Sequence, residues 1–137
     1  MTDKEFEYQY ALGALSEDDL IRETKKSTSK YILTILSKNE NWSVRYRVAR
    51  NPNTPVEILT KLSKDKDWFV RKCVARNPNT PVEVLTKLSK DKYWDIRKSV
   101  SQNPNTPVDV LTRLLADKDW TIRDNAERTL LDKGIEV

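Results

Sequence analysis

Residues 51–76 read NPNTPVEILTKLSKDKDWFVRKCVAR, and residues 77–102 read NPNTPVEVLTKLSKDKYWDIRKSVSQ. The two stretches agree at 19 of 26 positions and follow each other without a gap. The same 26-residue spacing separates Trp42, Trp68, Trp94 and Trp120, which defines four units, 25–50, 51–76, 77–102 and 103–128. Self-similarity at a short fixed period is typical of repeat architectures. The chain is therefore expected to fold as a stack of similar units.

The first half of each unit predicts a short amphipathic helix. In unit 51–76, Ile58, Leu59 and Leu62 recur at helical spacing, and the helix is expected to run to about residue 64. The preceding Thr54-Pro55-Val56-Glu57 has the pattern of a capping box, in which Thr54 would accept a hydrogen bond from a backbone amide and proline would occupy the first helical position.

The second half of each unit predicts a second helix. In unit 51–76 it is expected from Trp68 to about Arg76, with Asp67 as its N-cap and with Val70 and Val74 in the core. It must stop before Pro78, because the residue before a proline is pushed out of the α region. Helices this short are not stable alone, so neighbouring units must supply their burial.

Residues 1–24 are expected to form a helical N-terminal cap, and residues 129–137 a C-terminal cap or tail. Helices are predicted over 3–15 and over 17–25, the second capped by Ser16, and Thr28 is the predicted N-cap of the next one. The apolar residues expected to cover the end of the stack are Phe6, Tyr10, Leu12, Leu15, Leu20 and Ile21. After the last unit, Leu130 and Leu131 are expected to extend the final helix to Gly134.

The composition excludes most enzyme classes. The chain has no histidine, one cysteine, Cys73, and two glycines. Catalytic Ser-His and Cys-His pairs, imidazole or cysteine-rich metal sites and glycine-rich phosphate loops are therefore excluded, and neither a cofactor nor a metal is expected. The segment 1–10 does not resemble a secretory signal, and no apolar run is long enough to span a membrane, so a cytoplasmic location is expected.

The pattern N-P-x-T-P-x-x-x-L-x-x-L, followed by D-x-x-x-x-V/I-R, resembles the leucine-rich repeat variant, a bacterial two-helix repeat related in architecture to HEAT and armadillo repeats. The resemblance covers residues 25–128. It implies an all-α fold, a right-handed α-solenoid of stacked helix pairs with the second helices on the concave side. In HEAT-like repeats an Asp and an Arg six positions later form a ladder between units, and the matching pairs here are Asp65/Arg71, Asp91/Arg97 and Asp117/Arg123.

A comparison of the units places a candidate binding surface on the second helices. Exposed positions on the first helices barely change, whereas positions one, four, five and eight after each Trp vary among the units. Neutral drift on solvated positions remains an alternative to binding. The residues assigned to the binding surface are Tyr46, Arg47, Arg50, Phe69, Lys72, Arg76, Tyr93, Asp95, Lys98 and Gln102. The four Trp are instead expected to pack between units, because they do not vary and large aromatic residues are mostly buried.

Charge varies along the chain. The formal net charge is −5 in residues 1–24, then +6, +3, +2 and −1 in the four units and −1 in the tail. A basic middle suits an acidic partner. We therefore expect a non-enzymatic protein-binding scaffold, a monomer or weak homodimer, that contacts an acidic protein. Nucleic-acid binding through the same basic groove is the alternative.

Overall fold

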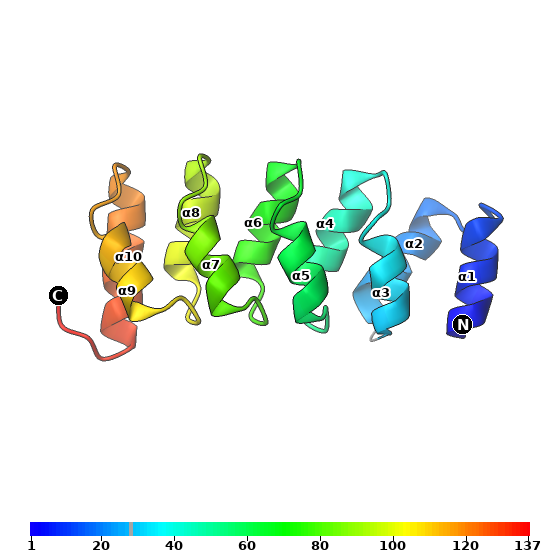
Figure 1. Ribbon diagram of the computed structural model, residues 1–137, viewed down its shortest axis with the longest axis horizontal. Helices are drawn as coiled ribbons and strands as arrows, with labels where there is room; N and C mark the ends of the chain where they lie inside the picture. Colours follow the sequence, from blue (N-terminus) through cyan, green and yellow to red (C-terminus); the bar gives the residue numbers. More distant parts are fainter. Residues whose placement is uncertain (28) are drawn as a thin grey trace.

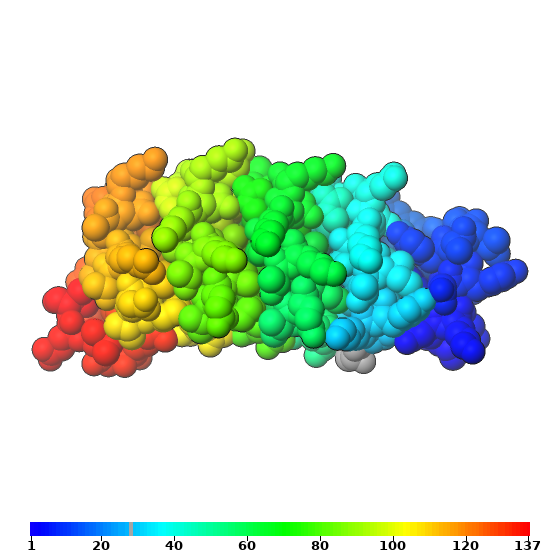
Figure 2. Space-filling view, viewed as in Figure 1, coloured from blue at the N-terminus to red at the C-terminus, as the bar shows by residue number. Residues whose placement is uncertain are grey.

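The computed structural model describes residues 1–27 and 29–137, which form ten α-helices and no β-strand. The helix pairs stand side by side in a row, with the chain termini at opposite ends (Figure 1). The space-filling view shows an elongated body in which the units follow one another in chain order (Figure 2). The helices are α1 (Asp3–Ala11), α2 (Glu17–Lys26), α3 (Lys30–Leu36), α4 (Trp42–Arg50), α5 (Val56–Leu62), α6 (Trp68–Arg76), α7 (Val82–Leu88), α8 (Trp94–Gln102), α9 (Val108–Leu114) and α10 (Trp120–Asp132). The predicted all-α repeat array is confirmed.

One hydrophobic core runs the length of the row, from Phe6 in α1 to Leu130 in α10. The second helices α4, α6, α8 and α10 pack against one another in order, and the first helices pack mainly against the second helices. Within unit 51–76 the buried residues include the predicted Ile58 and Leu59 of α5 and Val70 and Val74 of α6. The row therefore supplies the burial that isolated seven- and nine-residue helices lack.

The predicted capping boxes of the first helices are wrong. Pro55, not Thr54, is the N-cap of α5, and it makes no side-chain cap. The Thr54 hydroxyl is buried and donates to the carbonyl of Val48 at 2.6 Å, and Thr80 repeats this bond to Val74 at 2.6 Å. The threonine thus donates to a carbonyl near the end of the preceding helix, which also accepts from a backbone amide, and does not accept from an amide of the next helix.

A buried asparagine ladder joins the loops between units. The Asn77 side-chain amide donates to the carbonyl of Ala49, at the end of unit 25–50, at 2.8 Å and to the carbonyl of Asn51, at the start of unit 51–76, at 3.0 Å. Asn103 makes the equivalent bonds to Ala75 at 2.8 Å and to Asn77 at 3.3 Å. Each asparagine therefore fixes the position of its unit on the one before.

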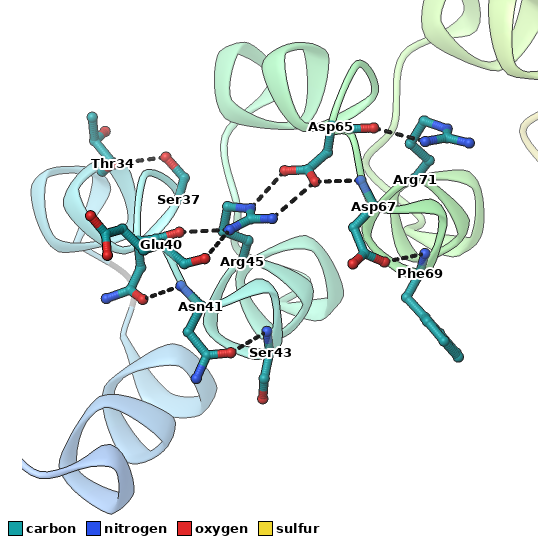
Figure 3. A network of polar contacts seen from close by, with 11 residues as sticks. Thr34, Ser37, Glu40, Asn41, Ser43, Arg45, Asp65, Asp67, Phe69 and Arg71 are labelled. Carbon is teal, nitrogen blue, oxygen red and sulfur yellow. Dashed lines mark hydrogen bonds and ion pairs between the residues drawn. The ribbon is translucent and has the colours of Figure 1, made fainter.

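An Arg–Asp ladder runs beside the second helices, with a register that differs from the expected one. The ion pairs join Arg45 to Asp65, Arg71 to Asp91 and Arg97 to Asp117, at 2.8, 2.9 and 2.9 Å, so each Arg pairs with the Asp of the following unit. The Asp six positions earlier does contact the Arg, but through its backbone carbonyl, as Asp65 does with Arg71 at 2.8 Å. Figure 3 shows Asp65 between the two arginines. The predicted side-chain pairs are therefore wrong for Asp65 with Arg71, Asp91 with Arg97 and Asp117 with Arg123.

The helices at the two ends differ in part from the prediction. Ser16 and Asp19 form the predicted capping box of α2, but α1 ends at Ala11 rather than residue 15, because Gly13 adopts a φ of +66° that terminates the helix. Leu12 is consequently exposed, contrary to the prediction. The N-cap of α3 is Ser29, and the predicted cap Thr28 lies outside the described residues.

The apolar residues of the ends are only partly as predicted. Phe6 is buried, and Tyr10, Leu15 and Leu20 pack against the core. At the other end Leu130 is buried, whereas Leu131 is exposed to solvent. The helix α10 ends just before Gly134, whose φ of +81° stops it as expected.

The prediction that all four Trp pack in the core between units is wrong. The side chains of Trp42, Trp94 and Trp120 are 44%, 51% and 69% exposed, and only Trp68 packs against the core. Each Trp is the first residue of its helix, about 200° around the axis from the core valine or isoleucine two positions later. The tryptophans therefore belong to the accessible surface.

Candidate interaction surface

All ten residues assigned to binding lie on or directly beside the second helices and reach solvent. We call this set the second-helix surface. Tyr46, Arg47, Lys72, Asp95 and Lys98 are half-buried, and Arg50, Phe69, Arg76, Tyr93 and Gln102 are exposed. The fifth residue after each Trp varies among the units and was therefore expected to be exposed. In α6 and α8 this residue, Cys73 and Ser99, is buried instead.

A hollow of about 330 Å³ lies between α4 and α6 and unites five of these residues. We call it the α4–α6 hollow. Tyr46 and Arg50 contribute from α4; Phe69, Lys72, Cys73 and Arg76 contribute from α6; Asn77 and Pro78 complete the lining. The Arg50 guanidinium lies 5.5 Å from the Tyr46 ring centroid and donates to its hydroxyl at 3.1 Å. Two aromatic rings and three cations therefore share one concave site.

A second hollow, of about 210 Å³, lies beside the first, between α2 and α4. We call it the α2–α4 hollow. Its lining includes Lys25 from α2 and Arg47 and Arg50 from α4, together with Thr24, Asn51 and Pro52. Arg50 lines both hollows, and the buried Nε of Arg47 has no hydrogen-bond partner among the described residues.

The remaining predicted residues lie outside both hollows, on the side of α8. Lys72 of α6 reaches across to Asp95 of α8 in an ion pair of 3.0 Å. Lys98 lies over the ring of Trp94 at 5.6 Å. The structure thus gathers the predicted residues of α4 and α6 around the hollows. It leaves Tyr93, Asp95, Lys98 and Gln102 outside them, with Asp95 joined to Lys72.

A stack of aromatic rings, which we call the aromatic ladder, borders the α4–α6 hollow. Phe69 stacks on Trp42 with centroids 5.5 Å apart and on Trp68 at 3.9 Å, and Trp68 in turn stacks on Tyr93 at 6.1 Å. Phe69 belongs to both the ladder and the hollow. Sequence reasoning missed Trp42 as a surface residue, although its helical angle relative to Val44 already pointed away from the core. It also missed Lys25, which only the packing of α2 on α4 brings to the site.

Cys73 shows how the charges converge on the α4–α6 hollow. Burial raises the pKa of its thiol to about 11, while the nearby charges of Arg50, Arg76 and Lys72 act in the opposite direction. The three cations therefore act on the same point in space. A thiol with so high a pKa is almost entirely protonated at neutral pH, so it is not an activated nucleophile.

Comparison with known families supports the assignment of the repeats. The leucine rich repeat variant model matches residues 68–92 and 94–119. These two segments are leucine rich repeat variants. The match confirms the resemblance inferred from the repeated sequence pattern. No curated protein matches the chain.

The matched variant repeats start at Trp68 and Trp94, so each match begins with a second helix and continues through the first helix of the next unit. Helical repeat arrays of this kind present extended surfaces to binding partners and are typical interaction modules. Within the part of the chain that the structure describes, none of the helices combines the length and apolar character that a bilayer crossing requires.

Proposed function

We propose that this chain is a non-enzymatic protein-binding scaffold whose second-helix surface contacts an acidic protein. One observation carries the proposal: five cationic side chains surround the two adjacent hollows, and no lining residue in the described chain is acidic. Such a cluster favours negatively charged groups and disfavours basic partners. The five cations are Lys25, Arg47, Arg50, Lys72 and Arg76.

Binding would proceed by presentation of a preformed surface. The continuous core and the Asn and Arg–Asp ladders hold α4 and α6 in a fixed relation, so little backbone ordering is required when the partner docks. Tyr46 and Phe69 would supply apolar anchors, and Arg50 and Arg76 would supply charge complementarity. Aromatic residues and arginines of this kind dominate the binding energy of many protein interfaces.

The aromatic ladder favours a second candidate, the binding of single-stranded nucleic acid. Exposed rings such as Trp42 and Trp94 offer stacking platforms that tolerate any base, and neighbouring cations would contact phosphates. The acidic segment 1–24 and the net charge of −1 in unit 103–128 limit the basic stretch to about three units. A long polyanion would therefore meet repulsion at both ends, which favours the protein partner.

The proposal is tested by capture of interacting proteins from an extract of the native host. The variant carries Arg47→Glu, Lys72→Glu and Lys98→Glu, and its matched control carries Lys61→Glu, Lys87→Glu and Arg113→Glu on the exposed face of the first helices. We expect the first variant to lose a specific partner that the control retains, with unchanged far-UV circular dichroism in both. Retention of the partner by the first variant refutes the surface assignment. Competition by an oligothymidylate, together with direct quenching of Trp fluorescence, identifies nucleic acid as the ligand instead.

A further inference from the structure

We infer that the α2–α4 and α4–α6 hollows form one two-part site that takes neighbouring glutamate or aspartate side chains of a single extended segment of the partner, with Arg50 between them. This inference rests on the proposed function and narrows it from the whole second-helix surface to α2, α4 and α6.

The two hollows are joined through one side chain. Arg50 lines both, so its guanidinium, with several donors in a fixed fork, is placed to contact carboxylates on either side. Lys25 and Arg47 line the α2–α4 hollow, and Arg76 lines the α4–α6 hollow together with Lys72, whose ammonium is also paired with Asp95 at 3.0 Å. Each hollow thus has its own cations as well as the shared one.

The unpaired donor of Arg47 is an independent indication of a ligand. Its Nε is buried and has no hydrogen-bond partner among the described residues. A buried donor without an acceptor is unfavourable. Because Arg47 lines the α2–α4 hollow, a carboxylate bound there would give its guanidinium an acceptor. A guanidinium can donate two parallel hydrogen bonds to the two oxygens of a carboxylate.

The α4–α6 hollow suits a carboxylate on a carbon stem. Its walls are the rings of Tyr46 and Phe69, and the small side chain of Cys73 leaves space where α4 carries Arg47 at the equivalent position. The methylene groups of a glutamate can pack on the rings while its carboxylate meets Arg50 and Arg76. The volume of about 330 Å³ accommodates such a side chain.

The site does not continue along the solenoid. Towards α8, the carboxylate of Asp95 is paired with Lys72 and so lies directly beyond the α4–α6 hollow. On the other side the segment 1–24 carries a net charge of −5. A short acidic segment fits between these limits, whereas a long nucleic-acid strand would extend past them.

The test measures fluorescence anisotropy with a labelled peptide that carries a run of glutamates between glycine–serine flanks. The same peptide with glutamines in place of the glutamates is the ligand control. Arg50→Met removes the shared cation and keeps an unbranched apolar stem. Arg128→Met is the matched protein control, because Arg128 occupies the same position in the last unit and is also exposed.

We expect Arg50→Met to raise the Kd for the glutamate peptide at least about tenfold, the size of an anchor-residue effect. Arg47→Met should weaken binding too, whereas Arg128→Met should leave the Kd within about twofold, as expected of a residue outside a binding centre. Far-UV circular dichroism confirms that the variants fold, and Arg50→Lys, which keeps the charge, should bind better than Arg50→Met.

Two outcomes overturn the inference and leave the proposed function intact. The first is a glutamate peptide that binds equally well to Arg50→Met and Arg128→Met. The second is a wild-type chain that does not bind the peptide but still captures a protein in the charge-reversal experiment. Absence of both peptide binding and protein capture refutes both proposals. If an oligothymidylate binds tightly and depends on Arg50, and the glutamate peptide does not bind, the ligand of the site is nucleic acid and the inferred acidic segment is wrong.

Discussion

Replacement of Arg97 by alanine tests how much the Arg–Asp ladder contributes to stability. The Arg97 and Asp117 side chains are only 8% exposed and are joined at 2.9 Å, and Arg97 also donates to the carbonyls of Asp91 at 2.9 Å and Lys92 at 3.2 Å. The substitution would leave Asp117 buried without its counter-ion. Removal of one partner of a buried pair costs about 3 to 5 kcal/mol.

The assay is urea unfolding followed by far-UV circular dichroism, with thermal unfolding in parallel. For a chain of this size the loss corresponds to a fall in Tm of about 10 to 20 °C. Arg113→Ala is the control, because Arg113 meets Asp109 at 3.9 Å with side chains 52% and 79% exposed, and such a pair contributes about 0.5 kcal/mol or less. Equal losses in the two variants would refute the structural role of the ladder.

Three further predictions follow from the buried polar groups. Asn77→Ala removes the bonds to the two preceding units and should lower the free energy of unfolding by about 2 to 3 kcal/mol, whereas the exposed Gln102→Ala should cost less than about 0.5 kcal/mol in the same urea titration. The Cys73 thiol, with a pKa raised to about 11, should react with iodoacetamide at pH 8 far more slowly than a free thiol and at the ordinary rate in urea; fast labelling of the folded chain would contradict its burial. Burial opposes ionisation of Asp117, but hydrogen bonds from Arg97 and the Asp119 amide hold its pKa below the usual value. Its contribution to folding stability is therefore present above about pH 4 and is lost as the pH falls further. In a plot of stability against pH, Asp117→Asn should reduce this loss at acid pH.

Hydrophobic periodicity predicted the architecture because packing decides it. The alternation of core and surface positions placed Ile58, Leu59, Val70 and Val74 correctly, and the proline after Asn77 set the end of α6. These features depend on local geometry and on a stripe of apolar residues, both of which are visible in one unit of sequence.

The contacts between units were harder to predict. Thr54 has the spacing of a cap, but its best acceptor, the Val48 carbonyl, becomes available only when the loop folds back on α4. Likewise Asp65 is six residues from Arg71 and twenty from Arg45, and only the stacking of units decides which guanidinium its carboxylate meets. Such choices depend on tertiary structure rather than on spacing.

The candidate site was predicted in part. The variable positions on α4 and α6 did identify residues that gather around one hollow, including Arg50 and Phe69. Comparison of units did not indicate Trp42, because invariance was interpreted as packing. It did not indicate Lys25, because Lys25 lies outside the second helix of its unit, where the variable positions were sought. The ion pair between Lys72 and Asp95 could not be predicted from the sequence, because it depends on how α8 packs against α6.

The central claim, that the second-helix surface receives the partner, is tested most directly by NMR. The ¹⁵N-labelled chain is titrated with the captured partner, and shifts of backbone amides and arginine Nε–H groups are mapped onto the structure. The account predicts the largest changes at Arg47, Arg50, Phe69, Lys72 and Arg76. Changes concentrated instead on the exposed first-helix residues Lys61, Lys87 and Arg113 would contradict it.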